Sequence, residues 1–305
     1  MPATAARTDP LAPFGRVLTA MVTPFRPDGG LDLDGVQRLA THLVDAGNDG
    51  LVVSGTTGES PTTSDAEKDA ILRATLEAVG DRAVVVAGAG PNDTRHTIQQ
   101  AQAAEKAGAD AVLLVTPYYN KPPQTGLLQH FTAIADGVGL PVMLYDIPHR
   151  TGVAIETETL VRLAGHPRIV AVKDAKGDLP AASAVMSRTD LVFYSGDDVL
   201  TLPFLSVGAA GVVGVATHVA TPRIAAMVQA YLAGDVGRAT ELHHELLPVF
   251  TGIFRTQGAI LTKAALNHLG LPGGPMRLPL PDATPEQVAQ LIRDLAAGRV
   301  DGFAA

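Results

Sequence analysis

Residues 111–148 read AVLLVTPYYNKPPQTGLLQHFTAIADGVGLPVMLYDIP, and this stretch decides the fold class. It begins and ends with short apolar runs, at 111–118 and 142–148. Between the two runs, apolar residues recur with the 3.6-residue period of a helix, at Leu127, Leu128, Phe131, Ile134 and Ala135. Continuously apolar runs are typical of parallel strands that are covered on both faces. The stretch therefore predicts one strand–helix–strand unit.

The same unit repeats along the chain. Short apolar runs begin 20 to 34 residues apart, at 15–25, 49–55, 83–90, 111–118, 142–148, 169–175, 191–196 and 211–217. This spacing holds one strand, one helix and two short loops. Eight such units favour an α/β protein with a closed (β/α)8 barrel, a TIM barrel. An open doubly wound sheet is the competing topology, and periodicity alone leaves it open.

After the eighth run the alternation stops, and residues 221–297 have only helical patterns. One helix is well marked, with Thr284 as its N-cap, Pro285 at its first position and Gln287 at the capping-box position. We therefore expect a flexible N-terminal leader over residues 1–14, a barrel catalytic domain over 15–233 and a C-terminal helical extension over 234–305.

Composition excludes several classes of function. The 305 residues include 23 basic and 31 acidic side chains, no basic cluster and no cysteine. Nucleic-acid binding needs clustered cations, and disulfides, thiolate catalysis and thiolate metal sites need cysteine. No secretion signal or long apolar span is present, so we expect a cytoplasmic protein without a membrane or nucleic-acid partner. The histidines lack metal-ligand spacing and no nucleotide-binding fingerprint is complete, so we expect neither a metal nor a cofactor.

The chemistry of a TIM barrel lies at the C-terminal ends of its strands, where the loops meet. The strand ending in Lys173 is otherwise apolar, so its amine is poorly solvated there. Desolvation favours the neutral amine, which is a nucleophile towards carbonyl groups. The alternative interpretations are an ion pair with Asp174, Asp197 or Asp198, or a phosphate-binding lysine.

Other polar side chains follow neighbouring strands. Tyr145 could move protons beside an imine-forming amine if hydroxyls such as those of Thr56 and Tyr119 relay them, or it could be a packed aromatic residue. Arg150 follows a proline in a predicted loop, free to bind a carboxylate or to form a surface ion pair. The turn that contains Thr56 and Thr57 suits a small carboxylate, although a tight turn alone would explain its glycines.

Taken together, these motifs resemble the dihydrodipicolinate synthase family of pyruvate-dependent class I aldolases, which includes N-acetylneuraminate lyase. The resemblance extends from about residue 15 to residue 298. It is carried by four motifs in the family's order and near its spacing: Gly55-Thr56-Thr57-Gly58-Glu59-Ser60, Pro117-Tyr118-Tyr119-Asn120, Tyr145-x-x-Pro148-x-Arg150-Thr151-Gly152 and Val172-Lys173-Asp174. Asp146 departs from the family, which often has asparagine there.

The resemblance implies a lyase that needs no cofactor. Lys173 would form a Schiff base with pyruvate, and the enamine would attack L-aspartate 4-semialdehyde to give 4-hydroxy-tetrahydrodipicolinate, in lysine and diaminopimelate biosynthesis. Tyr145, Thr56 and Tyr119 resemble the family's proton relay, with Tyr119 reaching into a neighbouring subunit. This arrangement implies a homo-oligomer, expected to be a tetramer built as a dimer of dimers.

The resemblance also implies the substrate contacts. Thr57 is similar to the residue that holds the pyruvate carboxylate, and Arg150 to the one that holds the semialdehyde carboxylate. Gly196 and Val213 are the further substrate-binding residues that we expect.

Three functions remain open at this point. Sialic acid lyases usually have Ser-Thr in place of Thr56-Thr57 and an apolar residue in place of Arg150, so both positions favour the synthase. The alternatives are another pyruvate-dependent aldolase, acting on N-acetylneuraminate or a sugar acid, and a non-catalytic barrel that binds a keto acid. Feedback inhibition by lysine is expected to be weak or absent, because Lys68 places a cation where inhibited relatives bind an ammonium group.

Overall fold

The computed structural model describes residues 9–303 and contains a closed parallel barrel of eight strands. Each strand pairs with the next along the chain, and β8 pairs with β1. The strands are β1 (Val17–Ala20), β2 (Gly50–Val53), β3 (Val84–Gly88), β4 (Ala111–Val115), β5 (Val142–Asp146), β6 (Ile169–Asp174), β7 (Val192–Ser195) and β8 (Gly211–Gly214). The predicted TIM barrel is confirmed, and the open sheet is excluded.

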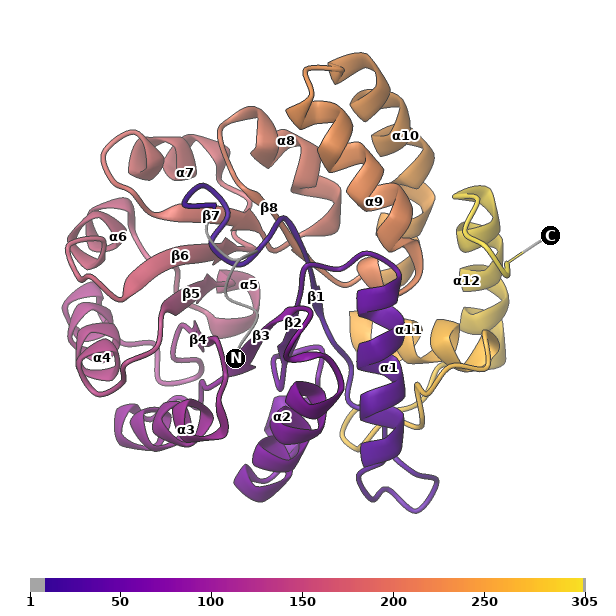
Figure 1. The fold of residues 1–305 in the computed structure, drawn as a ribbon, viewed down its shortest axis with the longest axis horizontal. Helices are drawn as coiled ribbons and strands as arrows, with labels where there is room; N and C mark the ends of the chain where they lie inside the picture. Colours follow the sequence, from indigo (N-terminus) through magenta and orange to yellow (C-terminus); the bar gives the residue numbers. More distant parts are fainter. Residues whose placement is uncertain (1–8, 304–305) are drawn as a thin grey trace.

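Helices surround the barrel (Figure 1). They are α1 (Leu33–Asp45), α2 (Asp65–Val79), α3 (Thr94–Ala107), α4 (Gln124–Asp136), α5 (Pro148–Thr151), α6 (Thr157–Leu163), α7 (Leu179–Met186) and α8 (Thr201–Ser206), with short 3-10 helices η1 (Ser60–Thr62) and η2 (Asp198–Leu200). On α4, four of the five residues in the predicted stripe are buried, and Leu128 is half-buried. The stripe therefore predicts the buried face correctly.

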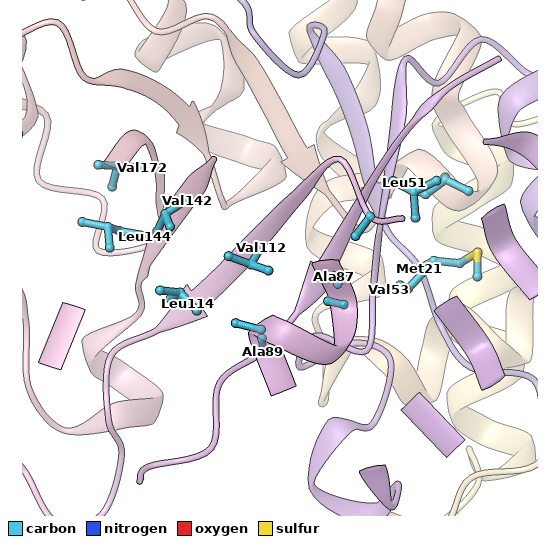
Figure 2. Close-up of a cluster of buried hydrophobic side chains, with 14 of the residues drawn as sticks. Met21, Leu51, Val53, Ala87, Ala89, Val112, Leu114, Val142, Leu144 and Val172 are labelled. Atoms are coloured by element: carbon cyan, nitrogen blue, oxygen red, sulfur yellow. The ribbon is translucent and has the colours of Figure 1, made fainter. Parts of the chain in front are cut away.

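The strands separate two apolar layers, because successive side chains point to opposite faces of a sheet. Alternate residues, such as Val112 and Leu114 on β4, pack with the helices outside the barrel. Figure 2 shows part of this outer layer. The residues between them, such as Ala111 and Leu113, belong to a second cluster that includes the barrel interior. Both faces of the sheet are thus covered, which explains the continuously apolar runs.

The same alternation directs Tyr145 and Lys173 inward. Tyr145 follows inward Met143 by two residues on β5, Lys173 follows inward Ala171 by two on β6, and the two residues are paired in register. The next residues, Asp146 and Asp174, therefore point outward. Their carboxylates accept hydrogen bonds from backbone N–H groups of the following loops. Strand register thus separates the candidate reactive groups from the acids beside them.

The C-terminal helices gather on one side of the barrel (Figure 1). They are α9 (Thr217–Leu232), α10 (Val236–Ile253), α11 (Gly258–His268) and α12 (Pro285–Ala297). Thr284 caps α12, and its capping box with Gln287 is present as predicted. The expected domain boundary after residue 233 falls in the turn between α9 and α10. No helix within residues 9–303 is long and apolar enough to cross a membrane.

The end of the predicted leader is buried in the structure. Residues 1–8 lie outside the described part of the chain, but residues 12–14 pack against the barrel. Phe14 is buried, its ring centroid lies 6.2 Å from that of Tyr194, and its N–H donates to the Tyr194 hydroxyl. Ala12 and Phe14 belong to the apolar cluster that includes the barrel interior, so this end of the predicted leader packs with the folded domain.

Candidate active site

A cavity of about 440 Å³ lies at the C-terminal ends of the strands. Loops from distant parts of the chain bring together most of the predicted site residues along its walls: Thr56, Thr57, Tyr145, Arg150, Lys173 and Gly196. The opposite wall comes from the C-terminal extension and includes Phe250, Phe254 and Gln257. The extension had no predicted part in the site, because its motifs carry no recognisable chemistry.

Lys173 is a buried amine in the wall of this cavity. Its side chain is only 4% exposed, and its Nζ lies 4.4 Å from the centroid of the Tyr145 ring. Burial lowers the pKa of the Lys173 ammonium from 10.5 to about 8; nearby Asp198 opposes this shift and Arg150 adds to it. About a tenth of this amine is therefore neutral at pH 7, far more than for an exposed lysine.

The alternative of an ion-paired Lys173 is not supported. Within residues 9–303, no carboxylate forms an ion pair with this lysine. Asp174 points outward and binds the N–H groups of Lys176 and Gly177. Asp198 is buried, but its carboxylate accepts hydrogen bonds from Val215 and Ala216. These backbone bonds hold the Asp198 charge in place, near enough to influence Lys173 without pairing with it.

Tyr145 lies between two cavities. It lines the cavity of Lys173 and a second one of about 240 Å³, and Thr56 and Arg150 also line both. Burial raises the pKa of the Tyr145 phenol to about 12, against the opposing effects of Arg150 and of a hydrogen bond with Thr56. The phenol therefore keeps its proton at neutral pH and can exchange it with a neighbouring hydroxyl or a substrate.

Arg150 lies in a short helix rather than the predicted loop. Helix α5 begins directly after β5 because Pro148 occupies its first position, and it ends at Gly152 with a φ of 78°. This single helical turn fixes the backbone of Arg150, and its side chain lines both cavities. A guanidinium at a cavity wall can bind a carboxylate through two parallel hydrogen bonds.

The turn carrying Thr56 and Thr57 has an unusual backbone. Ser54 and Glu59 both have a φ of 55°, a left-handed conformation that non-glycine residues rarely adopt. Hydrogen bonds from Glu59 N–H to the Thr56 carbonyl and from the Thr23 hydroxyl to the Gly58 carbonyl hold the turn. Both threonines are thereby presented to the cavity from a fixed loop.

Gly196 provides space for Lys173, whereas Val213 does not reach the cavity. A Cβ at Gly196 would lie 3.0 Å from Cγ of Lys173, so any larger residue would crowd the lysine stem. Val213 is fully buried on β8, and Val215 lines the cavity instead. The predicted direct contact of Val213 with substrate therefore finds no support in the cavity lining, which this segment reaches two residues further on.

Tyr119 is not brought to the cavity of its own chain. It lines neither of the two cavities, its side chain is 89% exposed, and its φ is 71°. A large aromatic side chain held outward by a left-handed backbone is an unusual feature of a protein surface.

Candidate metal ligands are not grouped in the described part of the chain. No three histidine, aspartate or glutamate side chains within residues 9–303 are arranged to hold a metal ion. His243 and His244 lie on α10, away from the lysine cavity, which they do not line.

Comparisons with known proteins agree with the geometry. The model of the dihydrodipicolinate synthetase family matches residues 13–297. The chain is 70% identical over 293 residues to 4-hydroxy-tetrahydrodipicolinate synthase of Acidothermus cellulolyticus, covering 96% of this chain and 95% of that protein. It is 67% identical over 296 residues to 4-hydroxy-tetrahydrodipicolinate synthase 2 of Streptomyces coelicolor, covering 97% of this chain and 99% of that protein.

Comparison with solved structures gives the same family as comparison of sequences. A crystal structure of DHDPS from Cyanidioschyzon merolae with lysine bound matches with a TM-score of 0.92 and 43% identity. The match covers 94% of this chain and 98% of that one. With a family model that matches almost the whole length and relatives at this level of identity, the assignment is plain: the chain belongs to the dihydrodipicolinate synthetase family.

Proposed function

We propose that this protein condenses pyruvate with L-aspartate 4-semialdehyde to form 4-hydroxy-tetrahydrodipicolinate, in lysine and diaminopimelate biosynthesis. The enzyme is a lyase of the class I aldolase type. One observation carries the chemistry: in a chain of this family, Lys173 is a buried amine with a lowered pKa in the wall of a cavity lined by hydroxyl groups and an arginine.

In the first half of the reaction, neutral Lys173 attacks the ketone carbon of pyruvate. The resulting carbinolamine loses water and becomes an iminium ion. The iminium withdraws electrons from the adjacent methyl group, which loses a proton to give an enamine. No separate cofactor is needed, because the imine itself is the electron sink.

In the second half, the enamine carbon attacks the aldehyde of the semialdehyde and forms the new carbon–carbon bond. The aldehyde oxygen gains a proton and becomes a hydroxyl. The substrate's own amine then attacks the iminium carbon, closes the ring and releases Lys173 as a free amine. Atoms balance with the loss of one water molecule.

Proton transfers in both halves fall to Tyr145 and Thr56, supported by their hydrogen bond and their place beside Lys173. Tyr119 of a partner subunit would complete the relay. The exposure of Tyr119 supports this role, because its hydroxyl is presented away from the cavity of its own chain. We accordingly propose a homotetramer formed from two dimers, in which each dimer shares its sites. The cytoplasmic location stays a prediction.

Two carboxylates need binding groups. Thr57 lines the cavity with Lys173 and would hold the pyruvate carboxylate through its hydroxyl and backbone N–H. Arg150 would hold the carboxylate of the semialdehyde. Gly196 leaves room for the substrate carbon attached to Lys173. The role of Val213 in substrate binding stays a prediction, and Val213 does not line the cavity.

A coupled assay tests this function. Wild-type protein with pyruvate and L-aspartate 4-semialdehyde should release product, whereas Lys173→Ala should not. Sugar aldehydes, including N-acetylmannosamine, should give no product with pyruvate. Turnover of a sugar aldehyde but not of the semialdehyde would favour the other aldolases. Pyruvate binding without any turnover would favour a non-catalytic barrel.

A further inference from the structure

The turn that carries Thr56 and Thr57 ends at a buried acid. Glu59 is 2% exposed and adopts a left-handed backbone conformation with a φ of 55°. A carboxylate in such a place needs a cation or hydrogen-bond donors, because burial of an unpaired charge is strongly unfavourable. The residues of the turn itself do not supply them.

Both partners of Glu59 come from the C-terminal extension, about 200 residues later in the chain. Nζ of Lys263 on α11 lies 2.5 Å from Glu59 Oε1, and the backbone N–H of Arg277 donates to Oε2 at 2.9 Å. Lys263 is itself 1% exposed, and its Nζ also donates to the Pro275 carbonyl at 2.8 Å. The charges of the acid and the lysine therefore compensate each other away from water.

An aromatic ring completes the cluster. Phe25 is buried, with Lys263 Nζ 4.3 Å and Arg277 Cζ 4.0 Å from its ring centroid. The Arg277 side chain then binds the Glu67 carboxylate at 2.6 Å and the Gly29 carbonyl at 2.8 Å. Arg277 thereby joins the extension to the loop after β1 and to α2.

The approach of the two segments depends on a glycine. Gly274 has a φ of 68°, and a Cβ there would lie 2.2 Å from the carbonyl oxygen of Phe25. No other residue fits this conformation and this space together. Gly274 therefore allows the chain before Arg277 to pass close to Phe25 and the Glu59–Lys263 pair.

The helix that carries Lys263 also forms a wall of the active-site cavity. Gln257, Gly258 and Ala259 at the start of α11 line the cavity. The Gln257 side chain caps the helix by accepting the Ala259 N–H at 2.7 Å. Lys263 lies one turn beyond Ala259. A single helix thus connects one wall of the cavity to the end of the threonine turn on another.

We propose that Glu59 and Lys263 form a positioning pair that fixes the Thr56–Thr57 turn against Lys173. This inference builds on the proposed function, because its kinetic test needs the pyruvate reaction. The pair acts through the turn and touches no substrate. It gives the C-terminal extension a role in the reaction: it supplies the cation that holds a left-handed, otherwise unfavourable turn in place.

Positioning explains a buried ion pair better than stabilisation of the fold does. Replacing such a pair by uncharged residues of similar size often leaves the stability of a protein unchanged, whereas removing one partner leaves a buried charge unpaired. The pair does fix a specific geometry. A displacement of a substrate-binding group by about 1 Å can reduce a rate about 100-fold.

The test compares three proteins. The first is the double variant Glu59→Gln with Lys263→Met, which removes both charges and keeps the shapes. The second is wild type. The third is the matched control Arg223→Met with Glu245→Gln, which removes a half-buried ion pair between α9 and α10 that does not line the cavity. Each is measured for thermal midpoint, steady-state kinetics and backbone amide exchange.

We expect the first variant to fold, with kcat/KM for pyruvate at least about tenfold lower. Its kcat/KM for the semialdehyde should fall less. Displacement of Thr56 slows proton transfer in both halves, but Thr57 holds only the pyruvate carboxylate, and Arg150 lies on α5, which carries no residue of the pair. Amide exchange should accelerate in the peptide that contains residues 54–62 and not in the barrel strands. The matched control should keep wild-type kinetics.

Three results would overturn the proposal: unchanged kinetics in the double variant, an equal loss of kcat/KM for both substrates, or a double variant that does not fold. The last result would make the pair a requirement of the fold. Retention of kcat/KM in the single variant Lys263→Arg, which keeps the charge, would support it. Failure of the proposed function would give a different result, because wild type itself would then show no reaction with pyruvate and the semialdehyde. Amide exchange would still show whether the double variant loosens the turn at residues 54–62.

Discussion

Replacing the buried amine of Lys173 by an uncharged side chain should stabilise the protein while abolishing its activity. The perturbation is Lys173→Met, which keeps an unbranched side chain and removes the charge. Lys173 is 4% exposed and has no carboxylate partner among the ion pairs of residues 9–303. Its burial is therefore only partly compensated, by the nearby charge of Asp198, and reduces the stability of the folded state.

The lowered pKa gives the magnitude. The pKa of Lys173 falls from 10.5 to about 8 on folding, which corresponds to about 3 kcal/mol. The unfolded chain holds this proton more tightly than the native state, so native stability is reduced by the full amount below pH 8. The penalty disappears as the pH rises from 8 to 10.5, where the unfolded chain also loses the proton. The expected gain in the variant is up to about 3 kcal/mol at pH 7, or roughly 5 °C in Tm for a chain of this length.

Calorimetric scans at several pH values between 7 and 10.5 measure this difference. The Tm of Lys173→Met should exceed that of wild type at pH 7, and the two should converge as the pH approaches 10.5. Lys176→Met is the matched control: Lys176 Nζ lies 3.5 Å from the buried carboxylate of Asp146, so its loss should destabilise the protein. A Lys173→Met variant that is less stable at pH 7, or a difference independent of pH, would refute the reasoning.

Four further outcomes are expected. Gly196→Ala should slow imine formation at least about tenfold, because its Cβ would lie 3.0 Å from the Lys173 stem; an unchanged rate of adduct formation would contradict this. His218 accepts a hydrogen bond from the Val22 N–H, and burial lowers its pKa to about 4. Because the unfolded chain takes up this proton first, wild type should lose about 3 kcal/mol of stability relative to His218→Gln as the pH falls from 6.5 to 4. Acid-denaturation curves of the two proteins that run parallel would argue against this. Mixing inactive Tyr119→Ala and Lys173→Ala subunits should restore activity, because each mixed dimer contains one intact site; mixtures that stay inactive would show that Tyr119 does not act across subunits. Submillimolar L-lysine should inhibit weakly or not at all, because Lys68 is held near the Thr63 carbonyl beside a small cavity; strong inhibition in the coupled assay would disprove this.

Local sequence patterns were sufficient to predict the barrel and most of the candidate site residues. Every apolar run contains a strand of the structure, because parallel strands covered on both faces need apolar residues at every position. Lys173 and Tyr145 could be identified because a polar residue at the end of such a run is an exception to this pattern. Their position on the inner face then follows from strand register.

Features that depend on contacts distant in sequence were not predicted. Glu59 and Lys263 are about 200 residues apart, and neither belongs to a pattern that identifies a partner. The influence of Asp198 on Lys173 likewise depends on how β7 and β8 bring their ends together. The helix around Arg150 escaped prediction because its four residues are too few to show a period. Periodicity identifies elements, but it cannot identify pairs that only the closed barrel brings into contact.

The most direct measurement of the central claim is reductive trapping at Lys173 as a function of pH. Wild-type protein is incubated with pyruvate and a hydride donor, and the modified peptide is quantified by mass spectrometry. We predict a covalent adduct on Lys173, formed about tenfold faster for each pH unit up to pH 8 and at a constant rate above it. An adduct on another lysine, no adduct, or a rate that continues to rise toward pH 10.5 would contradict the claim that burial makes this amine the nucleophile.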